Sequence, residues 1–297
     1  MRVIALGFFD GVHLGHQALM HACAAQAECL GATAAAISFD SHPSSLLSSK
    51  QEGLLTLPAE REALMREHGI QELIMLPFDD ALMHMQWDDF VRDVLAARLD
   101  AVHLVCGADF RFGWQGAGNS TLLRDLCDSL GIGLSVIPPV CMNGEPVSST
   151  RIRTLMQSGE MAAAVALLGH PYRLTGTVLH GRGLGHTLGF PTANLEFPDT
   201  LLPPAFGVYA CRALLPDAAR TAVVNLGVRP TVDRTEAIHV EAWIQDHDGD
   251  LYGRELTLEF LAFLRPEQRF PNLDVLRAQV LQDGENARAA VPSSPSI

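Results

Sequence analysis

A short apolar segment at residues 3–6 runs directly into a turn with three glycines and two histidines, Gly7-Phe8-Phe9-Asp10-Gly11-Val12-His13-Leu14-Gly15-His16. The apolar and partly β-branched segment is typical of a buried strand, and apolar residues at helical spacing over 17–30 predict a helix. Glycines let the backbone turn tightly and approach a ligand closely. Because the amides at a helix start attract anions, the combination indicates a nucleotide phosphate site.

Each part of this pattern also has a simpler explanation. Glycine-rich turns between a strand and a helix occur in many α/β proteins that bind no phosphate. His13 and His16 could cap or pack the helix, or bind zinc with His42, although no third ligand lies at the usual spacing nearby. Since histidines spaced by three face the same side of a helix, we predict that both donate hydrogen bonds to phosphate, more effectively if protonated.

Strands and helices alternate over the first 150 residues. This alternation predicts a parallel sheet with helices on both faces, and ligands bind such sheets beyond the carboxyl ends of the strands. Four segments that follow predicted strands should therefore meet in one crevice. They are the turn at Gly7, the His42-Pro43 segment, the Asp109–Gly113 loop and the residues after 147. The predicted strands are 3–7, 33–39, 72–76, 102–106 and 133–137, and the predicted helices are 15–30, 58–68, 87–98 and 119–130.

The second half of the chain has a different pattern. Helices are predicted over 149–157 and about 160–168, and Pro171 marks a boundary. Strands without intervening helices then suggest an antiparallel β-barrel, closed by a helix over 271–288. The predicted strands are 172–179, 207–214, 220–226, 237–246 and 255–262. We expect an N-terminal domain at 1–158, a linker helix at 159–170, a barrel domain at 171–290 and a flexible tail at 291–297.

Composition narrows the kinds of partner. The formal net charge of −13 argues against nucleic-acid binding, and an anionic nucleotide would need local arginines and a divalent cation. No apolar run reaches the ~18 residues that span a bilayer, so no membrane partner is expected. Six cysteines occur singly, which indicates a reducing, cytoplasmic location. We expect small-molecule partners, and a monomer or weak homo-oligomer.

Five motifs in order resemble the bifunctional riboflavin kinase/FAD synthetases of bacteria, over nearly the whole chain. The Gly7–His16 turn is the first. The other four, in order, are Ser38-Phe39-Asp40-Ser41-His42-Pro43, Cys106-Gly107-Ala108-Asp109-Phe110-Arg111-Phe112-Gly113 with Gly118-Asn119, Val147-Ser148-Ser149-Thr150-Arg151-Ile152-Arg153, and Gly189-Phe190-Pro191-Thr192-Ala193-Asn194. In the second motif, Ser41 stands where the family usually has proline. Just after the third motif, Trp114 and Gln115 stand where basic residues are usual.

The resemblance implies that the N-terminal half is a Rossmann-like nucleotidyltransferase domain. This domain would adenylylate FMN to FAD with ATP, with His13 and His16 as catalytic residues. Asp10 could instead hold the loop through backbone amides, Phe110 and Phe112 could belong to the core, and the Ser/Thr run could be an ordinary helix cap. The implied nucleotide-binding residues are Gly7, Phe9, Asp10, Gly11, Asp109, Arg111, Ser148, Ser149, Thr150 and Arg153. The implied flavin-binding residues are Phe110, Phe112, Asn119 and Arg265.

In the barrel domain, the resemblance assigns Gly181, Pro191, Thr192 and Asn194 to the nucleotide of a riboflavin kinase. Thr192 and Asn194 are oxygen donors two residues apart, which suits Mg²⁺ on an extended segment, although the tetrapeptide could also be a simple turn. Glu241 is the predicted base that accepts the proton of the ribityl hydroxyl, or alternatively an exposed strand carboxylate.

The implied function is phosphorylation of riboflavin to FMN, followed by adenylylation of FMN to FAD, with ATP and Mg²⁺ and with both flavins as substrates or products. The loop at 180–186, which is usually basic in the family, carries little positive charge here. An alternative is therefore an FMN adenylyltransferase whose kinase half is a degenerate flavin-binding sensor. A nucleotidyltransferase for another phosphate compound is a further alternative, although the Thr192/Asn194 domain argues against it.

Overall fold

The computed structural model describes residues 1–39, 53–181, 189–230 and 236–291. The chain divides into two compact units, Met1–Ser149 and Thr150–Ile297. Among the described residues, no helix combines the length and the apolar character needed to cross a membrane.

The N-terminal unit is built on a five-stranded sheet with the order β3-β2-β1-β4-β7, in which all neighbours are parallel. The strands are β1 (Arg2–Leu6), β2 (Thr33–Phe39), β3 (Glu72–Leu76), β4 (Ala101–Gly107) and β7 (Gly133–Ile137). The strand order reverses between β1 and β4, and such a switch point is where open α/β sheets bind ligands. The predicted parallel sheet is confirmed, with strand ends within two residues of those expected.

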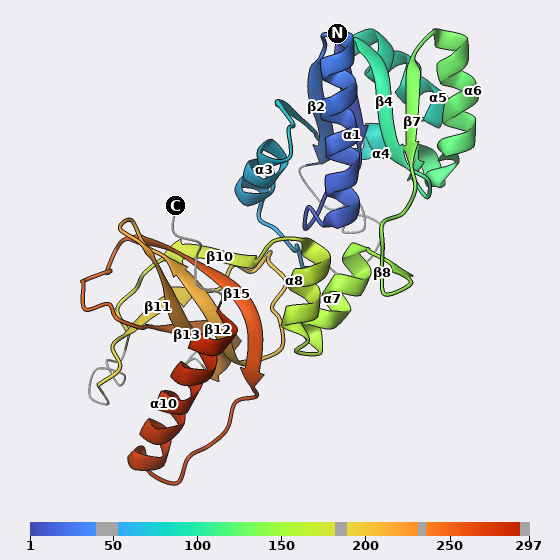
Figure 1. Cartoon of the computed structure of the whole chain (residues 1–297). Coiled ribbons are helices and arrows are strands. Elements are labelled where there is room, and N and C mark those ends of the chain that lie inside the picture. Colours follow the sequence, from blue (N-terminus) through green and yellow to red (C-terminus); the bar gives the residue numbers. More distant parts are fainter. Residues whose placement is uncertain (40–52, 182–188, 231–235, 292–297) are drawn as a thin grey trace. The chain divides into compact units, whose positions relative to one another are not determined.

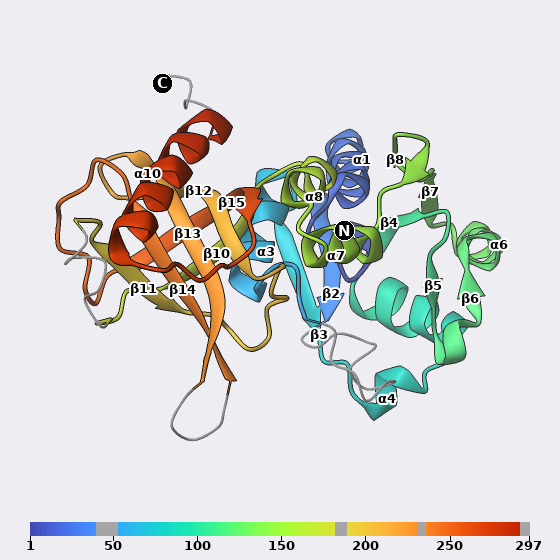
Figure 2. The same ribbon diagram turned by 90° about the horizontal axis from the view of Figure 1, so that it is seen from below.

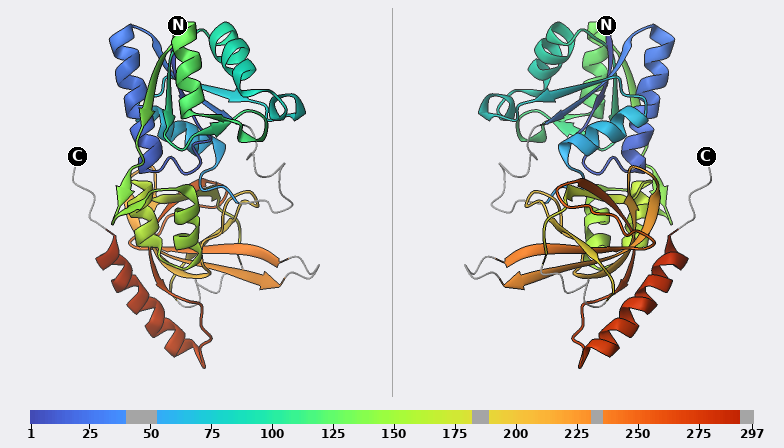
Figure 3. Two further views of the ribbon diagram at one scale, coloured as in Figure 1. Left: turned by 90° about the vertical axis from the view of Figure 1, so that its right-hand side faces the viewer. Right: turned by 90° about the vertical axis from the view of Figure 1, so that its left-hand side faces the viewer.

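Helices cover both faces of this sheet (Figures 1 and 3). On one face, α1 (Leu14–Leu30) and α3 (Pro58–Glu67) pack on Val3 and Ala5 of β1. On the other, the π-helical segment η1 (Phe90–Arg98) and α6 (Ser120–Leu130) pack on Ile4 and Leu6. Successive residues of a strand point to opposite faces, so a strand that is apolar throughout is buried on both sides.

Several short elements of the N-terminal unit were not predicted. Two-residue strands and single helical turns are too short to produce a hydrophobic period. They are α4 (Asp80–Met83), β5 (Arg111–Phe112), the 3₁₀ turn η2 (Trp114–Gly116), β6 (Gly118–Asn119), β8 (Cys141–Met142) and β9 (Glu145–Pro146), whereas α5 (Trp87–Asp89) and η1 together form the helix predicted over 87–98. Three of them, α4, β5 and η2, border an apolar pocket of this unit, described below.

The C-terminal unit contains a curled six-stranded antiparallel sheet with the order β10-β15-β12-β13-β14-β11. An antiparallel bridge between Leu179, just after β10, and Asn194 of β11 links the two edges of the sheet. The predicted antiparallel β-domain is confirmed, and β11 is an additional strand formed by the Thr-Ala-Asn motif. The strands are β10 (Tyr172–Thr177), β11 (Thr192–Glu196), β12 (Gly207–Leu214), β13 (Ala219–Pro230), β14 (Glu236–Ile244) and β15 (Glu255–Arg265).

Within the described residues, three helices accompany this sheet. The chain enters the unit through α7 (Ser149–Gln157) and α8 (Met161–Leu168). The closing helix α10 (Leu273–Ala290) lies across β12 and β13 (Figure 2). Its Ala287 is fully buried with Val208 and Val223 of those strands, so α10 is an integral part of the fold, as the amphipathic pattern predicts.

Candidate functional site

The turn after β1 has a strained backbone. Phe9 and Val12 are non-glycine residues with φ angles of 58° and 37°, and Gly11 has a φ of 81°. Such conformations cost about 1–3 kcal/mol each for non-glycine residues, and they persist only where the surroundings enforce them. At Gly7, a Cβ atom would lie 3.0 Å from the Phe9 ring. The turn is therefore a preformed element, and its strain is typical of a functional site.

His13 and His16 lie face to face at the start of α1. Their ring centroids are 3.6 Å apart with the planes inclined by 16°, and the Phe9 ring meets His16 edge to face at 5.3 Å. His13 also caps the helix, because its Nδ1 accepts a hydrogen bond from the backbone amide of His16 at 3.3 Å. A Cβ atom at Gly15 would lie 3.1 Å from the His13 ring, so this glycine leaves room for the stack.

The surroundings of His16 favour its neutral form. Burial lowers its pKa well below the usual value, and the charges of His13 and Arg61 lower it further. Its Nδ1 atom is buried and has no hydrogen-bond partner within the described parts of the chain. Protonation, which would make His16 a stronger donor, is therefore disfavoured, since two charged rings in a stack would repel each other. A neutral imidazole still provides one N–H donor.

Asp10 fastens the turn to a segment that lies about 45 residues further along the chain. Its buried carboxylate accepts hydrogen bonds from the backbone amides of Leu55 at 2.9 Å and Thr56 at 3.2 Å. The amide of Gly11 donates to the Thr56 hydroxyl at 3.1 Å. These bonds match the loop-holding alternative for Asp10, and they bring Gly11 into the same network.

Arg61 of α3 is a residue of this site that sequence reasoning missed. It is 1% exposed, its Nη1 donates to the Phe8 carbonyl oxygen at 3.2 Å, and its guanidinium lies 4.7 Å from the centre of the Phe8 ring. Burial lowers its pKa, and the Asp10 charge opposes this shift. The available signal was its position among Leu64 and Met65 on the buried face of the helix, where a charge is unusual.

The Ser148–Arg153 motif reaches the turn through its first residues. The Ser149 hydroxyl donates to the Asp10 carbonyl oxygen at 3.1 Å, and a Cβ atom at Gly15 would lie 3.8 Å from the Val147 carbonyl oxygen. The first and fourth motifs thus lie together, as predicted from the shared sheet edge. Of the other motif residues, Ser148 is half-buried, Thr150 is exposed and Arg153 is buried on α7.

The loop after β4 carries the third motif. Phe110 and Phe112 stack with centroids 5.1 Å apart and planes inclined by 15°, whereas Asp109 and Arg111 are exposed. Asn119 caps α6, because its Oδ1 accepts hydrogen bonds from the Thr121 and Leu122 amides, both at 3.0 Å. The capping bonds occupy the Asn119 carbonyl oxygen and leave its NH₂ group for other contacts.

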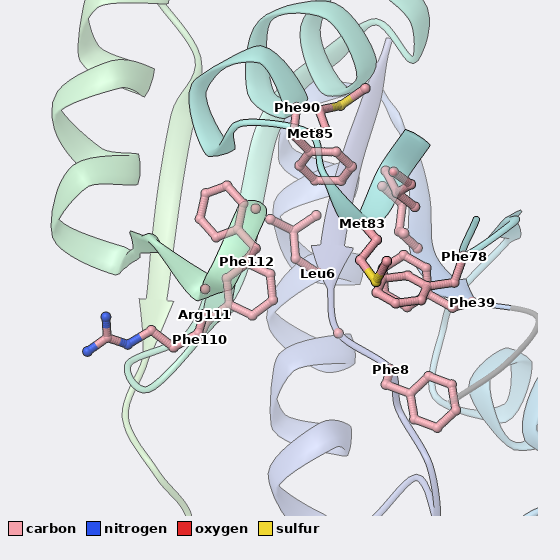
Figure 4. Close-up of a pocket in the computed structure, with 15 residues that line it drawn as sticks. Leu6, Phe8, Phe39, Phe78, Met83, Met85, Phe90, Phe110, Arg111 and Phe112 are labelled. Carbon is pink, nitrogen blue, oxygen red and sulfur yellow. The ribbon is translucent and has the colours of Figure 1, made fainter. Parts of the chain in front are cut away.

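A largely apolar pocket of about 420 Å³ opens beside the turn (Figure 4). Gly7 and Phe8 of the turn line it directly, so the pocket and the strained turn are continuous. In Figure 4 the Phe110 and Phe112 rings face it from the loop after β4, and the Arg111 guanidinium points away from the ring cluster. Further apolar residues that line the pocket, and that sequence reasoning did not place there, are Phe39, Phe78, Met83, Met85 and Phe90.

In the C-terminal unit, Asn194 and Glu241 are direct cross-strand neighbours of the β11–β14 pair. Residues in such a pair have their side chains on the same face of the sheet. Gly181 lies against Asn194, because a Cβ atom there would be 2.3 Å from Asn194 Nδ2. Thr192 lies two residues before Asn194 and faces the same side. The fold therefore brings the predicted nucleotide, metal and base residues of the barrel to one place.

This group of residues fits a hard divalent cation. The Asn194 amide nitrogen donates to the Thr192 carbonyl at 3.4 Å, which leaves the Asn194 Oδ1 as an acceptor. The Thr192 hydroxyl and the Glu241 carboxylate add oxygen atoms from the same strand pair, and Mg²⁺ prefers oxygen ligands. Pro191 and Thr192 also line a pocket of about 400 Å³ bordered by residues 247–252.

Arg265 forms an ion pair within the C-terminal unit. Its guanidinium forms a two-pronged ion pair with the buried Asp283 of α10, at 3.0 Å from Nε to Oδ1 and 2.8 Å from Nη2 to Oδ2. Gln279 donates to the same carboxylate at 2.9 Å. The predicted contact of Arg265 with flavin would have to coexist with this pair.

Three predicted features fall outside the described residues. They are the part of the second motif that contains His42 and Pro43, the weakly basic loop from 182 to 186, and the tail from 292 to 297.

Comparisons with known proteins match both units. A family model described as FAD synthetase matches residues 1–151, and one described as riboflavin kinase matches residues 168–291. The bifunctional riboflavin kinase/FMN adenylyltransferase of Listeria monocytogenes is 34% identical over 97% of this chain and 92% of its own length. The Pseudomonas fluorescens protein with the same name is 34% identical over 98% of this chain and 94% of its own length. A crystal structure described as a macrolide-efflux protein from Streptococcus pneumoniae is 29% identical, covers 97% of this chain and 94% of its own, and has a TM-score of 0.89.

Proposed function

The chain belongs to the family of bifunctional riboflavin kinase/FMN adenylyltransferases, and we propose that each structural unit performs one of the two reactions. The protein phosphorylates riboflavin to FMN with ATP, and it then adenylylates FMN to FAD with release of pyrophosphate. The matches of the two family models to residues 1–151 and 168–291 support the assignment of adenylyl transfer to the N-terminal unit and of phosphorylation to the barrel.

One observation supports the N-terminal assignment most directly: the strained turn with its two histidines opens into an apolar, aromatic pocket. The pocket suits the isoalloxazine ring of FMN, with Phe110 and Phe112 beside the ring. The turn suits the phosphates of ATP, because the start of a helix such as α1 attracts anions. A flavin in the pocket therefore has its phosphate near the α-phosphorus of ATP.

In this reaction, an FMN phosphate oxygen attacks the α-phosphorus of ATP and pyrophosphate leaves. The protein supplies no nucleophile, so its contribution is to orient both substrates and to stabilise negative charge. His13 and His16 are the proposed donors to the transferring phosphate. Ser148, Ser149, Thr150 and Arg153 would bind the leaving phosphates. The remaining proposed nucleotide ligands are Gly7, Phe9, Asp10, Gly11, Asp109 and Arg111, and Asn119 is a proposed flavin ligand.

In the barrel, Thr192 and Asn194 are the proposed ligands of the magnesium ion that accompanies ATP, with Gly181 and Pro191 beside the nucleotide. When bound, Mg²⁺ neutralises phosphate charge. Glu241 would accept the proton of the ribityl hydroxyl as that oxygen attacks the γ-phosphorus. Its position opposite Asn194 in the strand register supports this role.

We propose functional domains at 1–158 and 171–290 joined by a linker helix at 159–170, in a cytoplasmic monomer or weak homo-oligomer. The six cysteines are free and four of them are buried, which supports a reducing compartment. The alternative of a degenerate, flavin-sensing kinase half is not favoured, since the riboflavin kinase model matches the whole barrel.

The test is to incubate the purified chain with riboflavin, ATP and Mg²⁺ and to separate the flavins by chromatography. We expect FMN first and FAD later. FAD formed only from supplied FMN would show an inactive kinase half. Retained flavin without turnover would contradict the proposed function.

A further inference from the structure

We propose that Arg61 is a positioning residue for adenylyl transfer, because it holds the Phe8 peptide and ring at the entrance of the turn that carries His13 and His16. This inference rests on the proposed function of the N-terminal unit. Arg61 is fixed on α3 and is almost completely buried, so it would act through the turn rather than by touching substrate.

The turn is held at three nearby points by residues 55–61. Arg61 Nη1 binds the Phe8 carbonyl oxygen at 3.2 Å, Leu55 and Thr56 bind the Asp10 carboxylate, and Thr56 also binds the Gly11 amide at 3.1 Å. Phe8 is the only one of these points that also lines the apolar pocket. Arg61 therefore links the pocket wall to the phosphate end of the turn.

The charge of Arg61 is not needed for packing. Its Nε is buried without a hydrogen-bond partner among the described residues, and no carboxylate in the described parts of the chain lies within 4.0 Å of it. Burying an incompletely paired charge is costly, and an apolar side chain of similar volume is often as good or better for stability. A cation beneath an anion-binding turn would instead lower the energy of bound phosphate, since charges act strongly across a buried region.

The same charge acts on His16. The groups that face the His16 ring are the stacked His13 and the Phe9 edge from its own turn, and Arg61 from α3, which in turn lies near Asp10. Arg61 and His13 both oppose protonation of His16, in addition to burial. Without the guanidinium charge, His16 should take up a proton at a higher pH.

The test compares Arg61→Met, Arg61→Lys and the matched control Arg66→Met in FAD formation from supplied FMN. Arg66 lies on the same helix but is exposed and paired with Glu62, so its replacement should leave both activities unchanged. Arg61 lies in the N-terminal unit, so a urea unfolding curve of that unit reports whether each variant remains folded, and FMN formation from riboflavin in the barrel serves as an internal control for the amount of active protein.

For Arg61→Met, kcat/KM for adenylyl transfer should fall by about tenfold or more, and the acidic limb of its pH profile should move up by about half a pH unit or more. Arg61→Lys keeps the charge but loses the planar guanidinium group and its fixed arrangement of N–H donors. It should therefore keep the wild-type pH limb while kcat falls. FMN formation should be unchanged in all three variants.

The proposal is overturned if the wild type makes FAD and Arg61→Met matches Arg66→Met in kcat/KM and in pH profile. If Arg61→Met does not fold, Arg61→Lys decides, and an unchanged kcat would then reject the proposal. Absence of FAD formation by the wild type would reject the proposed function itself, which is a different result.

Discussion

The ion pair between Asp283 of α10 and Arg265 of β15 should determine how firmly α10 is held on the barrel. Asp283→Ala removes a carboxylate that is 2% exposed and that accepts bonds from Arg265 and from Gln279. Removing one partner of a fully buried pair costs about 3–5 kcal/mol. The Arg265 side chain is 18% exposed and can be partly hydrated after the change, so we expect a loss of about 2–4 kcal/mol.

An exposed ion pair on the same helix offers a matched control. Arg288 contacts Asp246 at 3.1 Å with side chains that are 58% and 80% exposed, so Asp246→Ala should cost less than about 1 kcal/mol. With a urea dependence of about 2 kcal/mol per M, Asp283→Ala should lower the unfolding midpoint of the barrel by about 1–2 M.

The assay follows each activity separately across a urea series. Riboflavin phosphorylation should be lost at lower urea in Asp283→Ala, whereas adenylylation of supplied FMN should keep its wild-type midpoint. Fluorescence of Trp243, against which Gly284 of α10 packs, reports the local transition. Equal midpoints for Asp283→Ala and Asp246→Ala would refute the reasoning, because the buried pair would then stabilise no more than the exposed one.

Three other predictions concern the chemistry. His16→Ala should abolish FAD formation while FMN still accumulates, since the proposed phosphate donor is lost from one unit only; equal loss of both steps would contradict separate sites. Asn194→Ala and Glu241→Gln should each stop FMN formation and spare adenylylation of supplied FMN, and retained phosphorylation in the Glu241 variant would exclude it as the base. Because the pKa of His16 is lowered in the folded protein, its neutral form persists below its usual value of about 6.5, so kcat/KM for adenylyl transfer should stay constant from pH 8 to about 6.5. Below that pH the unfolded chain takes up the proton more readily than the folded one, and stability should fall as well; an acidic limb centred near 6.5 in the wild type would argue that His16 is not held neutral.

Local pattern was sufficient for the elements that are long and regular. The apolar strands of the N-terminal half, the change to strands without helices after Pro171, and the final amphipathic helix all appear in the structure. The strand at Thr192–Glu196 was not among the predicted strands, although its residues alternate between polar and apolar and their burial follows this alternation; at five residues the segment was interpreted only as an extended motif. Its pairing with β14 depends on residues nearly 50 positions away, which no local pattern reports.

Individual roles within the site depended on contacts between distant segments. The resemblance predicted that Asp10 and Asn119 contact bound ligands. In the structure, both side chains accept hydrogen bonds from backbone amides. Arg265 was expected beside flavin, and it pairs with Asp283. The partner of each side chain is a group that folding brings within hydrogen-bond distance, and these groups belong to segments that a local sequence pattern does not connect.

The sequence alone determined the two-domain organisation, the parallel and antiparallel classes of sheet, and the type of chemistry, because hydrophobic period and ordered motifs are local properties of the chain. Only the tertiary structure decided the charge state of His16, the burial of Arg61 beneath the turn, and the shape of the aromatic pocket. Burial and electrostatic interaction depend on distances between segments that are far apart in sequence, and those distances exist only after folding.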